Sequence, residues 1–166
     1  MKKAVFLDRD GVINDNYRPV NRPEDLKLYP WSAQSILQLN QAGYYVFVVT
    51  NQGGIEMGYF NEKDLNDIHE KLVSEVKKHG AHIDEIDFCP HFKSKCECRK
   101  PSPGMLKRLA RKYDISLNHS FMVGDRDVDI EAGLKSGCKT IKIGKPYKKA
   151  DYTVGNLLEA VNIILS

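Results

Sequence analysis

The chain has 166 residues, a formal net charge of +3 at pH 7, and 42% hydrophobic and 28% charged residues. This length favours a single domain spanning residues 1–166, and the small net charge gives no reason to expect a nucleic-acid or membrane partner. No apolar run approaches the ~20 residues of a membrane-spanning helix. Met1-Lys2-Lys3 leads into an apolar run too short for a signal peptide, so we expect a cytoplasmic protein.

The first predicted strand begins at Ala4 and runs into Asp8-Arg9-Asp10-Gly11. A short apolar run predicts a buried strand, and the residues after it leave the sheet at its carboxyl edge, where open α/β sheets place their sites. If the extended backbone continues, Asp8 and Asp10 point the same way. Two adjacent carboxylates repel unless a cation lies between them, and such oxygen-rich sites suit Mg²⁺. The alternative is a surface turn with solvated aspartates.

Helical and strand patterns alternate along the rest of the chain. A proline-containing loop over 15–30 is followed by amphipathic, helix-like segments and by β-branched, strand-like segments. Predicted helices cover 31–42, 61–78, a segment starting at 103, 128–135 and 156–165, and predicted strands cover 44–49, 83–88, 120–123, 139–143 and 152–154. This alternation predicts an α/β fold, with a Rossmann-like parallel sheet covered by helices on both faces.

Polar residues follow three of the predicted strands. Right-handed crossovers place all strand-end loops of a parallel sheet at one edge, so we expect these residues to converge. They are Asp8 with Asp10, Thr50 with Asn51, and Asp125 with Asp129. Three such clusters at one edge are improbable as independent turns, and together they predict a functional site.

The converging residues suit metal-assisted phosphoryl transfer. Asp8, Asp10 and Asp125 offer a hard-cation site, because Mg²⁺ binds one or two carboxylates together with substrate phosphate. Thr50 and Asn51 can donate hydrogen bonds to phosphate oxygens. An aspartate can attack phosphorus covalently, and a neighbouring carboxylate can protonate the leaving oxygen. A simple strand-terminating turn over 50–52 is the alternative for that segment.

Two further acids and two basic residues complete this set. Arg99-Lys100 offers a planar fork and a point charge, the two ways in which side chains bind phosphate, although plain surface charge is the alternative. Asp129 is either an outer group near the metal or an ordinary acid in the first turn of a helix. Asp127 is predicted to be solvated at the same helix start.

Three of the four cysteines lie within one loop, together with a histidine. The clustered residues are Cys89, His91, Cys96 and Cys98. Clustering of this kind favours a metal over disulfides, and the set matches a closed structural Zn²⁺ site with four protein ligands. We expect the ion to fasten the loop that presents Arg99 and Lys100. Reduced thiols without metal are the alternative.

The ordered motifs resemble those of the haloacid dehalogenase superfamily of phosphohydrolases, and the match spans nearly the whole chain. Segments 50–55, 89–91 and 96–101 are similar to its small branch without a large cap domain, which includes heptose bisphosphate and histidinol-phosphate phosphatases. The motifs are Asp8-Arg9-Asp10-Gly11, Thr50-Asn51, Lys100 and Gly124-Asp125-x-x-x-Asp129.

The resemblance implies a role for each motif residue. Asp8 is the nucleophile that forms an aspartyl-phosphate, and Asp10 is the general acid and base. Mg²⁺ lies on Asp8, the carbonyl of Asp10 and Asp125. The phosphoryl group is held by Thr50 and Lys100, and the substrate is contacted by Asn51, Gln52 and Arg99. The resemblance also implies a monomer.

Two departures from the relatives' pattern concern the substrate. Heptose bisphosphate phosphatases usually have a serine where this chain has Gly53, and an arginine where it has Met57. We therefore expect a small phosphorylated metabolite, foremost D-glycero-D-manno-heptose 1,7-bisphosphate, with histidinol phosphate as the alternative. An open site of this type could also take a phosphorylated nucleic-acid end. A non-catalytic, zinc-stabilised phosphate-binding module is the alternative of another class.

Overall fold

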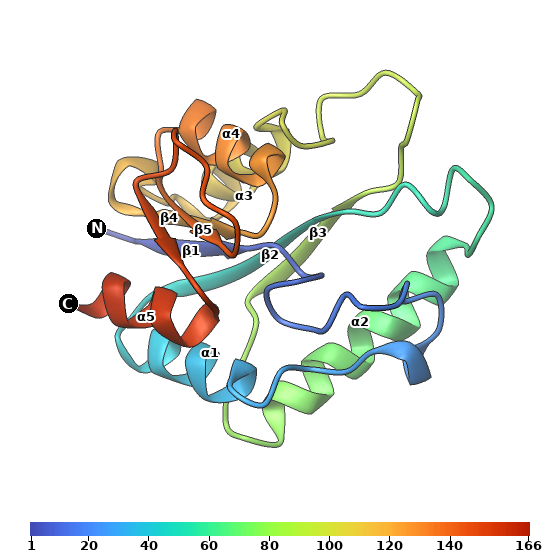
Figure 1. The fold of residues 1–166 in the computed structure, drawn as a ribbon, viewed down its shortest axis with the longest axis horizontal. Helices are drawn as coiled ribbons and strands as arrows, with labels where there is room; N and C mark the ends of the chain where they lie inside the picture. Colours follow the sequence, from blue (N-terminus) through green and yellow to red (C-terminus); the bar gives the residue numbers. More distant parts are fainter.

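A computed structural model describes all residues from Met1 to Ser166. Six strands form one sheet in the order β3-β2-β1-β4-β5-β6, and every neighbouring pair is parallel (Figure 1). The prediction of a Rossmann-like parallel sheet is therefore confirmed. The strands are β1 (Ala4–Leu7), β2 (Tyr45–Asn51), β3 (Glu85–Cys89), β4 (Phe121–Gly124), β5 (Lys139–Ile143) and β6 (Tyr152–Val154).

Five α-helices cover both faces of this sheet. In Figure 1, α1, α2 and α5 lie on one side and α3 and α4 on the other. Two separate clusters of buried apolar side chains fill the two layers, and each contains residues from the helices on its own side. The helices are α1 (Ser32–Gln41), α2 (Glu62–Lys77), α3 (Gly104–Tyr113), α4 (Asp127–Ser136) and α5 (Leu157–Leu165). None of them combines the length and the apolar character that crossing a membrane requires.

The composition of β1 follows from its central position. All four of its side chains are buried, since helices cover both faces. Val5 and Leu7 join the core beneath α1, α2 and α5, whereas Ala4 and Phe6 join the core beneath α3 and α4. A strand in this position needs apolar residues on both faces, which explains its uninterrupted apolar run.

Local signals also place the start of α2. The side chain of Asn61 accepts a hydrogen bond from the backbone N–H of Asp64 at 2.8 Å, and Asp64 accepts one from the N–H of Asn61 at 3.0 Å. This reciprocal pair is a capping box, which satisfies backbone donors that the first helical turn leaves free. The predicted beginning of this helix is confirmed.

The end of β2 lies two residues beyond the predicted 44–49. Thr50 and Asn51 belong to the strand itself, since they pair with Phe88 and Cys89 of β3. Pairing with a neighbour outweighs the weak strand preference of these polar residues. As a result, both side chains project from the rigid end of a strand.

The topology creates a crevice between β1 and β4. The chain passes from β1 to β2 and β3 on one side, and then returns to β4 on the other side of β1. Open α/β sheets bind ligands at such a switch point, outside the carboxyl ends of the strands. The long connection over 8–31 runs beside this edge, and the Nζ of Lys71 on α2 fastens it by donating to the carbonyl of Pro23 at 2.9 Å.

Candidate active site

A small cavity of about 150 Å³ opens at the carboxyl ends of β1, β2 and β4. It brings together the three polar clusters that the sequence predicts, along with Lys100. A larger hollow of about 550 Å³ is lined mainly by α3 and the cysteine loop, away from these strand ends. The small cavity is lined by Asp8, Asp10, Asn16, Thr50, Asn51, Lys100, Asp125, Arg126, Val128 and Asp129.

Three carboxylates meet at the floor of this cavity. Oxygens of Asp8, Asp125 and Asp129 lie within 4.8 Å of one another. Burial raises the pKa of Asp8 well above its usual range, and the negative charge of Asp129 raises it further. Burial and Asp129 raise the pKa of Asp125 as well. Like charges held this close are costly unless a cation offsets them.

One oxygen of this group has no partner in the protein. The Oδ1 of Asp125 is buried and accepts no hydrogen bond, while its Oδ2 accepts one from the Nδ2 of Asn16 at 3.2 Å. A buried oxygen without a donor is rare in folded proteins, and it is the kind of ligand that Mg²⁺ prefers. The residues present therefore fit a divalent cation bound between Asp8 and Asp125.

The carboxylate of Asp10 lies outside this group. The backbone turns over residues 9–13, where the carbonyl of Arg9 accepts from the N–H of Ile13 at 2.9 Å. Asp8 and Asp10 both line the cavity, but Asp10 is not among the clustered carboxylates, so its main-chain carbonyl is its candidate metal ligand.

Four donors surround the Asp10 carboxylate instead. Its Oδ1 accepts from the Nε of Arg9 at 3.0 Å and from the Nδ2 of Asn14 at 2.9 Å. Its Oδ2 accepts from the Nη2 of Arg9 at 3.2 Å and from the Nε2 of Gln52 at 3.4 Å. Burial raises the pKa of Asp10, but the charge of Arg9 and these hydrogen bonds outweigh it and lower the pKa.

Lys100 joins two of the carboxylates through its ammonium group. Its Nζ lies 2.9 Å from Asp8, 2.6 Å from Asp129 and 2.8 Å from the carbonyl of Val49, and the residue is only 3% exposed. Burial alone would lower the pKa of Lys100, but Asp129 and Asp8 outweigh it and raise the pKa. Lys100 is therefore a fixed positive charge beside Asp8.

The side-chain amides of Asn51 and Gln52, at the end of β2, hydrogen-bond to other protein groups. The sequence did not predict these partners. The Nδ2 of Asn51 donates to the carbonyl of Lys100 at 3.1 Å, and its Oδ1 accepts from the N–H of Lys100 at 3.0 Å. Asn51 thus holds the backbone of Lys100 in place. The Nε2 of Gln52 donates to the hydroxyl of Thr50 at 2.9 Å, so Gln52 links Thr50 to Asp10.

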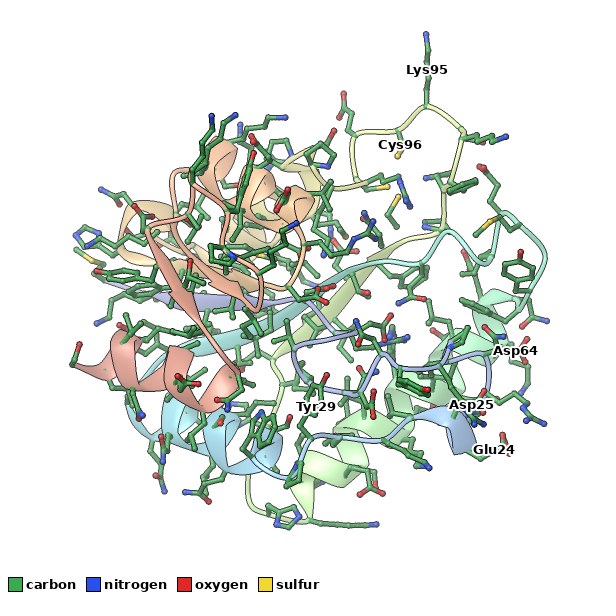
Figure 2. All side chains as sticks on the ribbon, viewed as in Figure 1. Glu24, Asp25, Tyr29, Asp64, Lys95 and Cys96 are labelled. Carbon is green, nitrogen blue, oxygen red and sulfur yellow. The ribbon has the colours of Figure 1, made fainter.

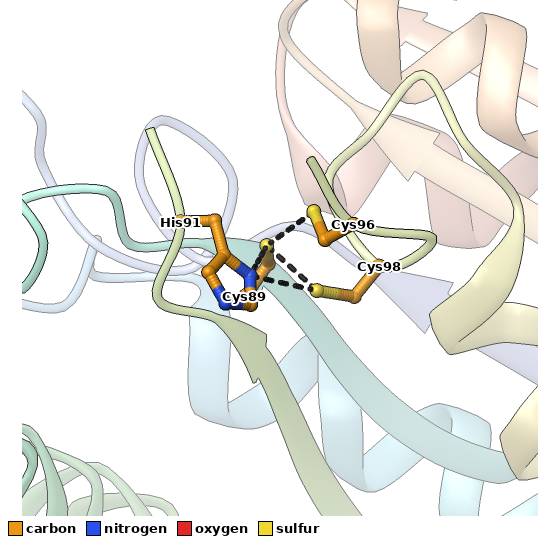
Figure 3. A group of neighbouring side chains, drawn as sticks. All are labelled: Cys89, His91, Cys96 and Cys98. Carbon is orange, nitrogen blue, oxygen red and sulfur yellow. Dashed lines mark hydrogen bonds between the residues drawn. The ribbon is translucent and has the colours of Figure 1, made fainter. Parts of the chain in front are cut away.

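The cysteine loop brings its predicted ligands to one point (Figure 3). The Sγ of Cys89 lies 2.8 Å from Cys98 and 3.6 Å from Cys96, and the Nδ1 of His91 lies 3.5 Å from both Cys89 and Cys98. All four cysteines of the chain are free. Three thiols and one imidazole nitrogen at this spacing could bind Zn²⁺.

A second property of the loop supports metal binding. The backbone N–H of Arg99 donates to the Sγ of Cys96 at 3.4 Å. Burial raises the pKa of the Cys96 thiol, but this bond and others lower it to about 6, which favours the thiolate that a metal requires. Lys95 extends outward at the tip of the loop, whereas the sulfur of Cys96 turns inward (Figure 2).

The same loop anchors the side chain of Arg99. Its Nη1 donates to the carbonyl of His91 at 2.9 Å, and its guanidinium lies 5.5 Å from the centre of the Phe92 ring. A Cβ at Gly53 would lie 3.2 Å from that Nη1, so the glycine leaves room for this arrangement. The two predicted phosphate-binding residues therefore differ in position. Lys100 lines the cavity, whereas Arg99 does not.

Several residues at or near the site had no signal in the sequence pattern. Asn16 and Arg126 line the cavity, and Arg126 is exposed. Arg9 is 1% exposed, and its Nη1 lies 3.0 Å from the Nε2 of His69, which comes from α2, far along the chain. Spacing along the chain cannot reveal such a pair. Asp127 is exposed, as expected.

Comparison with known proteins decides the family. A family model described as HAD-hydrolase-like matches residues 97–155. The chain is 43% identical over 144 residues to the D-glycero-beta-D-manno-heptose-1,7-bisphosphate 7-phosphatase of Rhodopseudomonas palustris, and the match covers 82% of this chain and 80% of that protein. This chain belongs to the haloacid dehalogenase-like phosphatases.

Two further relatives of this family extend the similarity. The D-glycero-alpha-D-manno-heptose-1,7-bisphosphate 7-phosphatase of Photorhabdus laumondii is 36% identical, over 87% of this chain and 85% of that protein. The crystal structure of the D,D-heptose 1,7-bisphosphate phosphatase of B. bronchiseptica, complexed with magnesium and phosphate, superposes with a TM-score of 0.90 at 34% identity, over 99% of this chain and 98% of that chain. The resemblance drawn from the motifs is confirmed, and the chain has the haloacid dehalogenase fold of a phosphatase.

Proposed function

We propose that this protein is a Mg²⁺-dependent phosphomonoesterase that hydrolyses D-glycero-D-manno-heptose 1,7-bisphosphate through an aspartyl-phosphate on Asp8. The observation that carries this proposal is the position of Asp8. Asp8 directly follows the central strand, is ion-paired to Lys100 and has an oxygen within 4.8 Å of an oxygen of Asp125, whose Oδ1 has no partner. Family membership then makes phosphoryl transfer the reaction that this arrangement serves.

In the first half of the reaction, the Asp8 carboxylate attacks phosphorus and the bond to the sugar oxygen breaks. Lys100 and Thr50 hold oxygens of the transferring phosphoryl group, and Asp10 delivers a proton to the leaving oxygen. Because Arg9 lowers the pKa of Asp10, the protonated carboxyl is a strong acid toward that oxygen. Mg²⁺, when held by Asp8, Asp125 and the carbonyl of Asp10, would neutralise charge on the carboxylates and the phosphate.

In the second half, water attacks the phosphorus of the aspartyl-phosphate. Asp10 accepts the proton of that water, phosphate leaves, and the Asp8 carboxylate is restored. The proton that Asp10 gains here is the one that it delivers in the next turnover, so the cycle balances. Asn51 does not need to touch the substrate in this scheme, since it positions the backbone of Lys100.

The substrate proposal draws on the relatives and on two arginine side chains near the cavity. The two curated relatives described above carry names of heptose bisphosphate phosphatases. A bisphosphate needs positive charge for its second phosphate, and Arg126 at the cavity and Arg99 on the cysteine loop supply it. We also propose that Gln52, whose amide donates to Thr50 and Asp10, contacts the substrate near the phosphoryl group.

We further assign a structural Zn²⁺ to the cysteine loop and a cytoplasmic location, because cysteines that stay reduced are typical of that compartment. Nothing in the site needs a second copy of the chain, so we propose that the enzyme acts as a monomer.

The test compares kcat/KM for both anomers of the heptose bisphosphate with kcat/KM for histidinol phosphate, in the presence of Mg²⁺. This ratio is the measure of specificity. We expect the heptose to be preferred and chelation of Mg²⁺ to abolish turnover. A higher kcat/KM for histidinol phosphate would overturn the substrate assignment. If none of these three compounds released phosphate, the proposal that the protein is a phosphatase would be overturned.

A further inference from the structure

We propose that His69 on α2 is a positioning residue for Asp10, acting through the buried guanidinium of Arg9. This inference rests on the proposed function, in which Asp10 transfers the proton to the leaving oxygen. Neither His69 nor Arg9 lines the cavity, so neither is a catalytic residue in the sense of touching the substrate.

Arg9 contacts Asp10 with two of its three nitrogens. The Nε and Nη2 atoms donate to the two carboxylate oxygens at 3.0 and 3.2 Å. A planar fork of this kind fixes the plane of the carboxylate as well as its distance. The orientation of Asp10 in the cavity therefore depends on how firmly the guanidinium itself is held.

His69 holds the third nitrogen. The Nη1 of Arg9 lies 3.0 Å from the Nε2 of His69, and the imidazole is 7% exposed. A guanidinium can only donate, so Nε2 accepts and the imidazole proton lies on Nδ1. Burial, and next the charge of Arg9, lower the pKa of His69 to about 3, which keeps the acceptor neutral at ordinary pH.

Loss of His69 would leave a buried N–H of Arg9 without a partner. Unpaired buried charged donors are costly, so the guanidinium would turn to find another acceptor. Any such turn moves the plane of the Asp10 carboxylate, since the two nitrogens that hold it belong to the same rigid group. The remaining donors, Asn14 and Gln52, each hold only one oxygen of Asp10.

The experiment compares two leaving groups in three variants. The variants are His69→Phe, which keeps a ring of similar size but has no acceptor, His69→Gln, whose amide oxygen can accept from Arg9, and Ile68→Val as a control in the neighbouring, fully buried position of α2. One substrate is p-nitrophenyl phosphate, whose phenolate leaves without a proton. The other is glycerol 2-phosphate, whose alkoxide requires one.

A misplaced general acid should affect only the second substrate strongly. We expect His69→Phe to lower kcat/KM on glycerol 2-phosphate by about 10²-fold, the cost of roughly a 1 Å misplacement, with a much smaller loss of kcat/KM on p-nitrophenyl phosphate. The comparison uses kcat/KM because this quantity reports the steps up to departure of the leaving group and excludes hydrolysis of the aspartyl-phosphate, which both substrates share. His69→Gln should recover most of that loss, and Ile68→Val should leave the ratio of the two rates unchanged. The ratio is measured in one preparation, so it does not depend on the fraction of folded protein.

Equal losses of kcat/KM on both substrates in His69→Phe would overturn the inference, because they would indicate a structural role alone. Failure of His69→Gln to restore the ratio would overturn it as well. These results differ from failure of the proposed function, in which the unmodified protein itself would release no phosphate from either substrate with Mg²⁺ present.

Discussion

The strand-end site and the cysteine loop both gather metal-binding side chains, but they do so in different ways. At the strand ends, Asp8, Asp125 and Asp129 face a cavity, and Asp125 keeps one oxygen without a partner. In the loop, Cys89, His91, Cys96 and Cys98 face one another, and together they can complete a tetrahedral site. An open ligand set leaves room for substrate, whereas a closed set leaves none. We therefore expect the strand-end site to carry out the reaction and the cysteine loop to stabilise the fold.

The two regions are nevertheless joined by consecutive residues. Arg99 bonds to the cysteine loop through His91 and Cys96, while Lys100 enters the cavity and pairs with Asp8. The loop therefore determines where the backbone of Lys100 reaches the cavity. Perturbing the loop should affect both stability and activity, whereas replacing the nucleophile Asp8 should affect mainly activity.

The largest expected effect is on the open site. Asp8→Asn should lower phosphate release by more than about 10⁴-fold, since it removes the nucleophile while keeping its size. Asp127→Asn is the matched control, because that exposed side chain, 62% accessible, lies outside the cavity lining and should leave turnover unchanged. Turnover that survives in Asp8→Asn would exclude an aspartyl-phosphate mechanism. Circular dichroism checks that both variants are folded.

The next effect separates the two metals. Cys96→Ser should lower the Tm by about 10 °C, because losing a structural metal costs more than about 4 kcal/mol and each kcal/mol shifts the Tm by about 2–4 °C. Chelation of Mg²⁺ should instead abolish activity and lower the Tm by less than Cys96→Ser does, since it restores only the repulsion among the carboxylates. Metal analysis of protein purified without added zinc should find one Zn²⁺ per chain in the unmodified protein and less in the variant. An absence of zinc in the unmodified protein would contradict the closed site.

A smaller effect tests the link between the regions. Asn51→Ala removes the two hydrogen bonds that hold the Lys100 backbone, so stability should fall by about 1–3 kcal/mol. We also expect kcat to fall about tenfold, because the ammonium group would shift within the cavity. Asn61→Ala, which removes the cap of α2, is the control: it should lower stability by about 1 kcal/mol and leave kcat unchanged. Equal kcat values in both variants would argue against positioning by Asn51.

The smallest effect concerns the surface that joins the 53–60 segment to the loop. The exposed Glu56 accepts from the backbone N–H groups of Lys93 at 2.6 Å and Ser94 at 3.2 Å, and these bonds lower its pKa to about 2. A carboxyl with a lowered folded pKa stabilises the protein above its unfolded pKa of about 4.3, and this stabilisation is lost as the pH falls toward 2. The Tm difference between the unmodified protein and Glu56→Gln should therefore be largest near pH 6 and shrink below pH 4. A difference that stays constant would rule out this contribution of Glu56.

The accuracy of the sequence-based predictions differs among the site residues. The apolar run before Asp8 predicted a buried strand because local composition reports burial on both faces directly. Asp8 and Asp10 both line the cavity, but the contact of Asp10 with the amide of Gln52 was not predictable, because Gln52 follows a different strand. Asp129 makes contacts of both kinds that the sequence offered: its Oδ2 accepts from the backbone N–H of Arg126 at 3.0 Å in the first turn of α4, and its Oδ1 lies 2.6 Å from the Nζ of Lys100. The role of His69 had no signal at all, since its partner Arg9 is distant along the chain.

The sequence by itself determined the alternation of strands and helices, the polar residues at the strand ends and the ligand set of the cysteine loop. These features depend on local composition and on the single edge at which parallel strands end. Only the tertiary structure decided which carboxylates share a cation site, which amides hold Lys100, and how Arg9 joins Asp10 to His69. Such contacts depend on the packing of distant elements, because a buried charge is tolerated only where the whole fold supplies its partners.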